Sequence, residues 1–279
     1  MDSTSTASVP APSVPLRSGA SPGASPLGGA PVAARGPLAV QLRERLRVDG
    51  LHFLQQTLVD AAAQARAGKR VTVVFDLDNT LFDTRARTLA IARRFDAEQG
   101  TSWCEGLTLH GVRLDAATTA AALGPPAPPS AWCEAFERYW AEEFWTPANL
   151  VHDLPIEATL HWVREAQAAG LIVRYLTGRT TPFQEASLQQ LRAAGIEVSP
   201  DDVVCKPSVD YATAPFKGDG LHRGAQEGHV AWFLTEGRRD LAHVEAHVAD
   251  VATVLLECSF EDEGAHAVRP ETPRLSRVF

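Results

Sequence analysis

The segment VTVVFDLDNTL, residues 71–81, decides how this chain folds. Its first five residues are mostly β-branched or aromatic, a composition and length typical of a strand that is buried on both faces. Two acids, Asp76 and Asp78, come at the end of this apolar run. In an open parallel sheet the reactive crevice lies outside the carboxyl ends of the strands. The segment therefore predicts a buried strand that carries two carboxylates to the chemically active edge of a sheet.

The rest of the chain alternates strand patterns with helix patterns. Strands are predicted at 171–176, 202–205, 229–234 and 251–257, and helices at about 182–194, 218–228 and 239–248. For the helix at 182–194, Thr181 is the expected N-cap, Gln184 could close a capping box, and Gly195 marks the end. The alternation predicts an α/β fold, a Rossmann-like three-layer core with a central parallel sheet.

Residues 84–152 interrupt this alternation. They show no strand pattern, read as helical near 86–98 and 131–144, and contain four of the six tryptophans. A simple crossover between parallel strands needs far less chain. We therefore expect a small, mainly helical cap at 84–152, inserted into an α/β core formed by 38–83 and 153–279. We interpret its tryptophans first as packing residues.

Composition narrows the class of protein. With 279 residues, 45% of them apolar, the chain can bury a core, whereas residues 1–37 are rich in Ser, Pro, Ala and Gly and predict a disordered tail. Four dispersed cysteines and the absence of a long apolar run predict a cytoplasmic protein without disulfides or a membrane partner. A net charge of −8 argues against non-specific nucleic-acid binding, so local cations must meet any anionic substrate.

Polar residues also follow the other predicted strands. Thr177, Gly178 and Arg179 follow the second strand, and Glu236 and Asp240 follow the fourth. A lysine is expected nearby, either Lys217, which opens the helix before the fourth strand, or Lys206; we favour Lys217. Together these positions predict a site made of acids, a hydroxyl and one cation.

Four segments, in this order, resemble the motifs of the haloacid dehalogenase (HAD) superfamily. They are VTVVFDLDNTLFD (71–83), YLTGR (175–179), either PFK (215–217) or CKP (205–207), and LTEGRRD (234–240). A single Asp-x-Asp-x-Thr is weak evidence, but four ordered motifs at predicted strand or helix ends are specific. The resemblance implies a HAD-type core, a cap inserted after the first strand, and hydrolysis of a phosphate monoester of a small metabolite.

The resemblance also implies a role for each residue. Asp76 would attack phosphorus and form an aspartyl-phosphate, and Asp78 would protonate the leaving oxygen and later accept a proton from water. The second task needs a carboxyl whose pKa is raised by its neighbours. The phosphate would be bound by Thr177, Gly178, Arg179 and Lys217.

Carboxylates close to a phosphate dianion require a compensating cation, and oxygen ligands favour Mg²⁺. By the resemblance, Mg²⁺ would be bound by Asp76, by the carbonyl oxygen of Asp78, and by an acid of the fourth motif. That motif begins with Glu236, where Asp is commoner, so the direct ligand could be Glu236 or Asp240.

Two other functions stay open. One is phosphoryl transfer between positions of one sugar by a mutase of the same superfamily, and the other is a catalytically reduced protein that binds a ligand or partner. Arg85 and Arg87 could also touch an anionic substrate. His243 and His247 have metal-ligand spacing, but an exposed helix face is the simpler interpretation.

Overall fold

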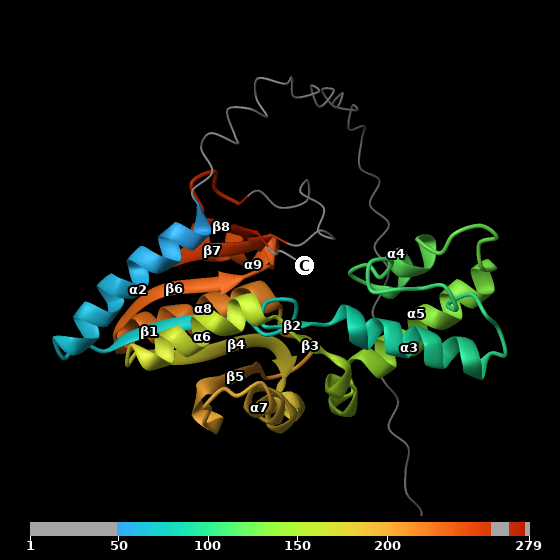
Figure 1. Ribbon diagram of the computed structural model, residues 1–279, viewed down its shortest axis with the longest axis horizontal. Coiled ribbons are helices and arrows are strands. Elements are labelled where there is room, and N and C mark those ends of the chain that lie inside the picture. Colours follow the sequence, from blue (N-terminus) through green and yellow to red (C-terminus); the bar gives the residue numbers. More distant parts are fainter. Residues whose placement is uncertain (1–48, 258–267, 277–279) are drawn as a thin grey trace, which may run out of the picture.

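The computed structural model describes residues 49–257 and 268–276, so the predicted tail at 1–37 lies outside the described residues. Its centre is a six-stranded sheet in the order β5-β4-β1-β6-β7-β8 (Figure 1). The strands are β1 (Val71–Phe75), β4 (Ile172–Thr180), β5 (Val203–Lys206), β6 (His229–Thr235), β7 (Ala252–Glu257) and β8 (Arg274–Ser276). Every neighbouring pair is parallel. All five residues of β1 are buried, as the sequence predicts for a strand between two others.

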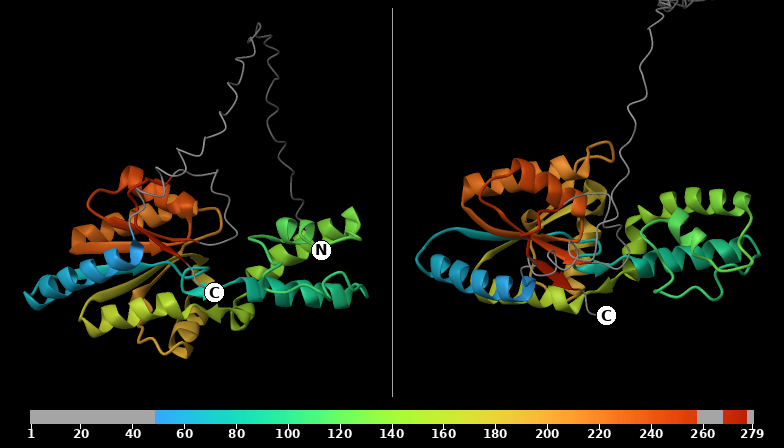
Figure 2. Two further views of the ribbon diagram at one scale, coloured as in Figure 1. Left: turned by 45° about the horizontal axis from the view of Figure 1, so that its top comes forward. Right: turned by 90° about the horizontal axis from the view of Figure 1, so that it is seen from above.

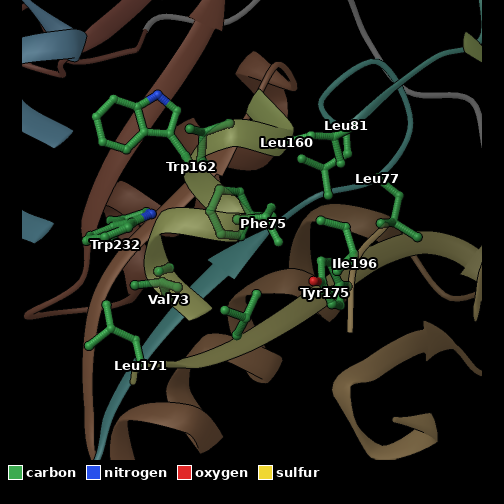
Figure 3. Close-up of a cluster of buried hydrophobic side chains, with 14 of the residues drawn as sticks. Val73, Phe75, Leu77, Leu81, Leu160, Trp162, Leu171, Tyr175, Ile196 and Trp232 are labelled. Carbon is green, nitrogen blue, oxygen red and sulfur yellow. The ribbon is translucent and has the colours of Figure 1, made fainter. Parts of the chain in front are cut away.

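Helices cover both faces of this sheet (Figures 1 and 2). One face packs against α2 (Gly50–Arg66), α6 (Glu157–Ala168) and α7 (Gln184–Ala193), and Figure 3 shows part of that cluster around Phe75 and Trp232. The other face packs against α8 (Thr213–Glu227) and α9 (Arg238–His247). These three layers confirm the predicted Rossmann-like α/β class.

A separate apolar cluster joins α3 (Arg85–Glu98), α4 (Ala116–Ala121) and α5 (Ser130–Phe144), which we call the helical unit. The rings of Phe95 and Trp132 meet edge to face, with centroids 5.2 Å apart, so this tryptophan is a packing residue. The unit stands to one side of the sheet in Figures 1 and 2. The boundaries at 84 and 152, and the role of a cap, stay predictions.

Short elements connect the helical unit to the core. The antiparallel pair β2 (Phe82–Asp83) and β3 (Leu154–Pro155) brings both ends of the insertion together, and the 3₁₀ turn η1 (Pro147–His152) precedes β3. Leu81 accepts a backbone hydrogen bond from Ile156, at 2.8 Å, which extends this contact. Both connections therefore leave the core at one place.

Some predicted helix ends differ from the structure. α8 begins at Thr213, five residues before the predicted 218, because Ala212 has the extended backbone that precedes a helix. α7 begins at Gln184, after the 3₁₀ turn η2 (Thr181–Phe183). The Gln184 side chain closes no capping box, since it donates to the Pro200 carbonyl in the 3₁₀ turn η3 (Pro200–Asp202). None of the described helices has the length and apolar character of a membrane span.

The sheet packing predicts the effect of two leucine substitutions. Leu160→Ala removes a fully buried side chain of α6, and we expect it to lower the free energy of unfolding by about 2–5 kcal/mol. Leu51→Ala, at a position that is 47% exposed on α2, should change it by less than about 0.5 kcal/mol. Urea denaturation of both variants measures this difference. Equal losses would contradict the layer assignment.

Candidate active site

Asp76 lies where β1 ends, and its buried carboxylate is held on both oxygens. The backbone N–H of Leu77 donates to Oδ1 at 2.8 Å, and the Thr235 hydroxyl donates to Oδ2 at 2.9 Å. The backbone N–H of Asp76 itself donates to the carbonyl of Leu234, at 3.0 Å, which joins the ends of β1 and β6. The carboxylate therefore has a fixed orientation at the carboxyl edge of the sheet.

The chain turns sharply after these residues. Asn79 has a φ of 55°, in the left-handed region that Asn tolerates better than most residues, and its side-chain oxygen accepts from both the N–H and the hydroxyl of Thr84. The Thr80 hydroxyl donates to Oε2 of Glu236 at 2.7 Å. The Asn and Thr of the first motif therefore shape this turn and tie it to the end of β6.

Lys217, from α8, connects two buried acids. Its Nζ donates to Oδ2 of Asp76 at 2.6 Å and to Oδ2 of Asp240, from the first turn of α9. Burial alone would lower the pKa of the Lys217 ammonium, but the charges of Asp240 and Asp76 outweigh burial and raise it above its usual value. Lys217 is therefore a permanent cation, and it is the lysine that reaches Asp76, whereas Lys206 bonds elsewhere.

The acids around Asp76 fit a hard cation. Glu236 Oε2 and Asp76 Oδ2 both accept from the Thr235 hydroxyl, and Asp240 shares Lys217 with Asp76. The described residues contain no ready-made group of three or more His, Cys, Asp or Glu ligands. Mg²⁺ does not need one, because it is usually bound by one or two carboxylates together with waters and substrate phosphate. His243 and His247 stack on each other, with ring centroids 4.2 Å apart, and in the described part of the chain they belong to no group of three or more possible metal ligands.

Asp78 is bound by two buried arginines. Arg179 donates to Oδ1 from Nη2 at 2.7 Å and to both oxygens from Nε at 3.2 Å, and Arg87 Nη2 donates to Oδ1 at 3.0 Å. Burial would raise the pKa of the Asp78 carboxyl, but the charges and hydrogen bonds of Arg179 and Arg87 outweigh it and hold the pKa well below its usual range. This corrects the sequence-based expectation of a raised pKa.

The side chains of Arg179, Arg87 and Arg85 are bound by groups of the protein itself. The remaining N–H groups of Arg179 reach Ser187, Gln190 and Asp153, and its guanidinium is fully buried, so phosphate binding by Arg179 stays a prediction. Arg87 is also fully buried and pairs with Asp153 through Nε at 2.8 Å, so it is not a surface contact for substrate. Arg85 pairs with Asp83. The physical reason is the same in each case: a buried guanidinium requires a nearby carboxylate.

Thr177 and Gly178 lie inside β4 and not after it, because the strand continues to Thr180, beyond its predicted end at 176, with an irregular register between Thr177 and Thr180. The Thr177 hydroxyl is fully buried and accepts from the backbone N–H of Arg179 at 3.2 Å, which leaves its own hydrogen to donate. A side chain at Gly178 would approach Cγ2 of Thr213 to 3.1 Å, so glycine lets this part of β4 lie close to the start of α8.

Three supporting residues escaped the sequence analysis. Thr235 has a signal in the sequence, since it follows the predicted strand at 229–234 and precedes Glu236, and Thr80 is the hydroxyl residue of Asp-x-Asp-x-Thr. Asp153 has none, because it comes from the end of the insertion and reaches Arg87 only through the fold.

No protein-family model matches the sequence, and no curated protein matches it either. Solved structures do match. A protein of Lactobacillus delbrueckii, provisionally named a phosphoglycolate phosphatase, has a TM-score of 0.50 at 12% identity, over 75% of this chain and 95% of its own. A haloacid dehalogenase-like hydrolase of Streptococcus pneumoniae has 0.48 at 11%, over 75% and 94%. A HAD-superfamily hydrolase of Geobacter sulfurreducens has 0.46 at 18%, over 69% and 89%.

This likeness concerns the fold. The chain has the HAD-like fold, with its parallel six-stranded sheet between helical layers, and the resemblance inferred from four motifs is confirmed at that level.

Removing the cation between the two acids should destabilise the fold. Lys217→Met leaves Asp76 and Asp240 buried without their partner, and we expect the free energy of unfolding to fall by about 3–5 kcal/mol at neutral pH. Adding Asp240→Asn should recover part of the loss, because one uncompensated charge disappears. Urea denaturation of both variants checks this, and a single variant as stable as the parent would refute the pairing.

The ion pairs of Asp78 with Arg179 and Arg87 predict that the free energy of unfolding depends on pH. Because the folded-state pKa of Asp78 lies below its unfolded value, these ion pairs stabilise the fold above about pH 4, and the contribution is lost as the pH falls further. The stability difference between the parent and Asp78→Asn should therefore narrow between pH 6 and pH 3. Asp60→Asn, an exposed control on α2, should show no such narrowing. A constant difference for Asp78→Asn would contradict the assignment.

Proposed function

We propose that this protein hydrolyses the phosphate monoester of a small molecule, with Mg²⁺, through an aspartyl-phosphate on Asp76. The observation that carries the proposal is the Asp76 carboxylate, buried at the carboxyl edge of the sheet and oriented by Leu77, Thr235 and Lys217. A nucleophile in a fixed orientation loses little entropy when it attacks. The HAD-like fold supports a hydrolase of this kind.

The proposed hydrolysis has two steps, and different side chains act in each. An Asp76 oxygen would form a bond to phosphorus while the bond to the leaving oxygen breaks, and the leaving oxygen would take a proton from solvent water. A second water would then attack phosphorus and release Asp76 and phosphate. Thr177 and the backbone of Gly178 would donate to the phosphoryl oxygens, and Lys217 would offset their charge. Asp78, held ionised by Arg179 and Arg87, suits the second step, in which it accepts a proton from the attacking water.

Magnesium would be bound by Asp76, by the Asp78 carbonyl oxygen, and by Glu236 or Asp240. When bound, it would supply positive charge between the nucleophile and the phosphate. The helical unit would act as the cap that excludes water and selects the leaving group.

Turnover of an aryl phosphate tests the proposal. The parent should hydrolyse it with Mg²⁺ and not after chelation, and Asp76→Asn should lose at least about 10³-fold in kcat. Asp60→Asn, exposed on α2, serves as the control and should keep the parental rate.

Comparable metal-dependent rates in the parent and Asp76→Asn would remove Asp76 from the nucleophile role. A parent that is inactive across a panel of metabolite phosphates would instead favour a ligand-binding protein.

A further inference from the structure

The chain contains three lysines, Lys69, Lys206 and Lys217, and two of them are buried at the carboxyl edge of the sheet. Lys217 belongs to the site described above. Lys206 ends β5, directly after Cys205, which pairs with Thr177 of β4. Lys206 has no role in the proposed mechanism.

Lys206 lacks the partner that buried cations normally have. Its residue is only 9% exposed, yet its Nζ makes just two long hydrogen bonds, to the Val209 carbonyl at 3.5 Å and to the Thr213 hydroxyl at 3.4 Å. Within residues 49–257 and 268–276, no carboxylate forms an ion pair with it, whereas Arg87, Arg179 and Lys217 each have one. An ammonium has three protons to donate, and burying it without an anion is unfavourable. Lys206 is therefore a cation with capacity for an anionic ligand.

The position of Lys206 relates it to the phosphate site. Its partner Thr213 packs on Gly178: a Cβ built there would lie 3.1 Å from Thr213 Cγ2 and 3.4 Å from its hydroxyl oxygen. Burial lowers the pKa of the Lys206 ammonium, while the charges of Asp240 and Asp210 raise it and that of Lys217 lowers it. Lys206 thus lies beside the part of β4 that, by our proposal, would hold the phosphoryl group.

The separation of the strands decides which part of a ligand Lys206 can meet. β5 is two strands from β1, so the two are about 10 Å apart, whereas a phosphoryl group on Asp76 would extend only a few ångströms. Nζ of Lys206 bonds to the Val209 carbonyl and the Thr213 hydroxyl, and within the described residues the cation that pairs with Asp76 is Lys217. An anion beside Lys206 would therefore be a second group of the substrate, several bonds from phosphorus.

We propose that Lys206 is a specificity-determining residue that binds a second anionic group, so that the substrate is a small phosphate monoester carrying an additional carboxylate or phosphate. This inference rests on the proposed function, whose site it extends toward β5. Lysine suits the task, because its compact ammonium interacts with carboxylate or phosphate as a point charge.

The test compares two substrates that differ in one group, 3-phosphoglycerate, which has a carboxylate, and glycerol 1-phosphate, which has a hydroxymethyl group there. The parent should favour 3-phosphoglycerate by about 10- to 100-fold in kcat/KM, the usual range for a hydrogen bond to a charged group. In Lys206→Met the ratio of the two kcat/KM values should fall to about 1, mainly because KM for 3-phosphoglycerate rises. Lys206→Arg, which keeps the charge, should retain part of the preference.

Lys69→Met is the matched control, since Lys69 is exposed beyond α2, and it should keep the parental ratio. Thermal unfolding of each variant separates loss of preference from loss of fold. Equal losses on both substrates in Lys206→Met, or a parent without preference, would overturn the inference while leaving the proposed function in place.

If the parent hydrolyses neither compound, the proposed function fails for these ligands, and calorimetric titration with both then tests Lys206 by itself. Tighter binding of 3-phosphoglycerate to the parent, lost in Lys206→Met, supports the second anion site. Equal affinities in the parent contradict it.

Discussion

The pairing of Lys217 with Asp76 and Asp240 is the interaction on which the rest of the site depends. It places one cation from α8 between acids that follow β1 and β6, so it joins three elements at the carboxyl edge of the sheet. Without it, two buried carboxylates would repel each other and pay the full penalty of desolvation. With it, the Asp76 carboxylate has a counterion that offsets part of the rise in its pKa caused by burial, and it keeps the orientation that the proposed attack on phosphorus requires.

A second charged network surrounds the first. Arg179 and Arg87 share Asp78 and Asp153, and these four residues come from β4, α3, the first motif and the end of the insertion. The helical unit is thereby connected to the Asp78 carboxylate through one side chain, Arg87 of α3. Because the two arginines hold the pKa of Asp78 well below its usual range, this carboxylate suits the proton-accepting role that we propose for it.

Much of this arrangement was predictable from local patterns. The apolar run at 71–75 and the strand–helix alternation predict the parallel sheet, and the motifs place Asp76, Asp78, Thr177 and Lys217 at its edge. Long-range pairing was not predictable. The partner of Arg179 depends on how α7 and the residues after η1 pack, and no spacing in the sequence links Asp153 to Arg87. Likewise, α8 begins at Thr213, earlier than the apolar pattern predicted, so Lys217 contacts Asp76 from inside this helix and not from its start.

The most direct measurement of the central claim is the identity of the residue that carries phosphate during turnover. The parent is mixed with Mg²⁺ and an aryl phosphate, quenched in acid, and reduced with borohydride, which converts an aspartyl-phosphate to homoserine. Peptide mass spectrometry should then find homoserine at position 76, and none in Asp76→Asn. Homoserine at another aspartate, or phosphate release without any modified aspartate, would contradict the account.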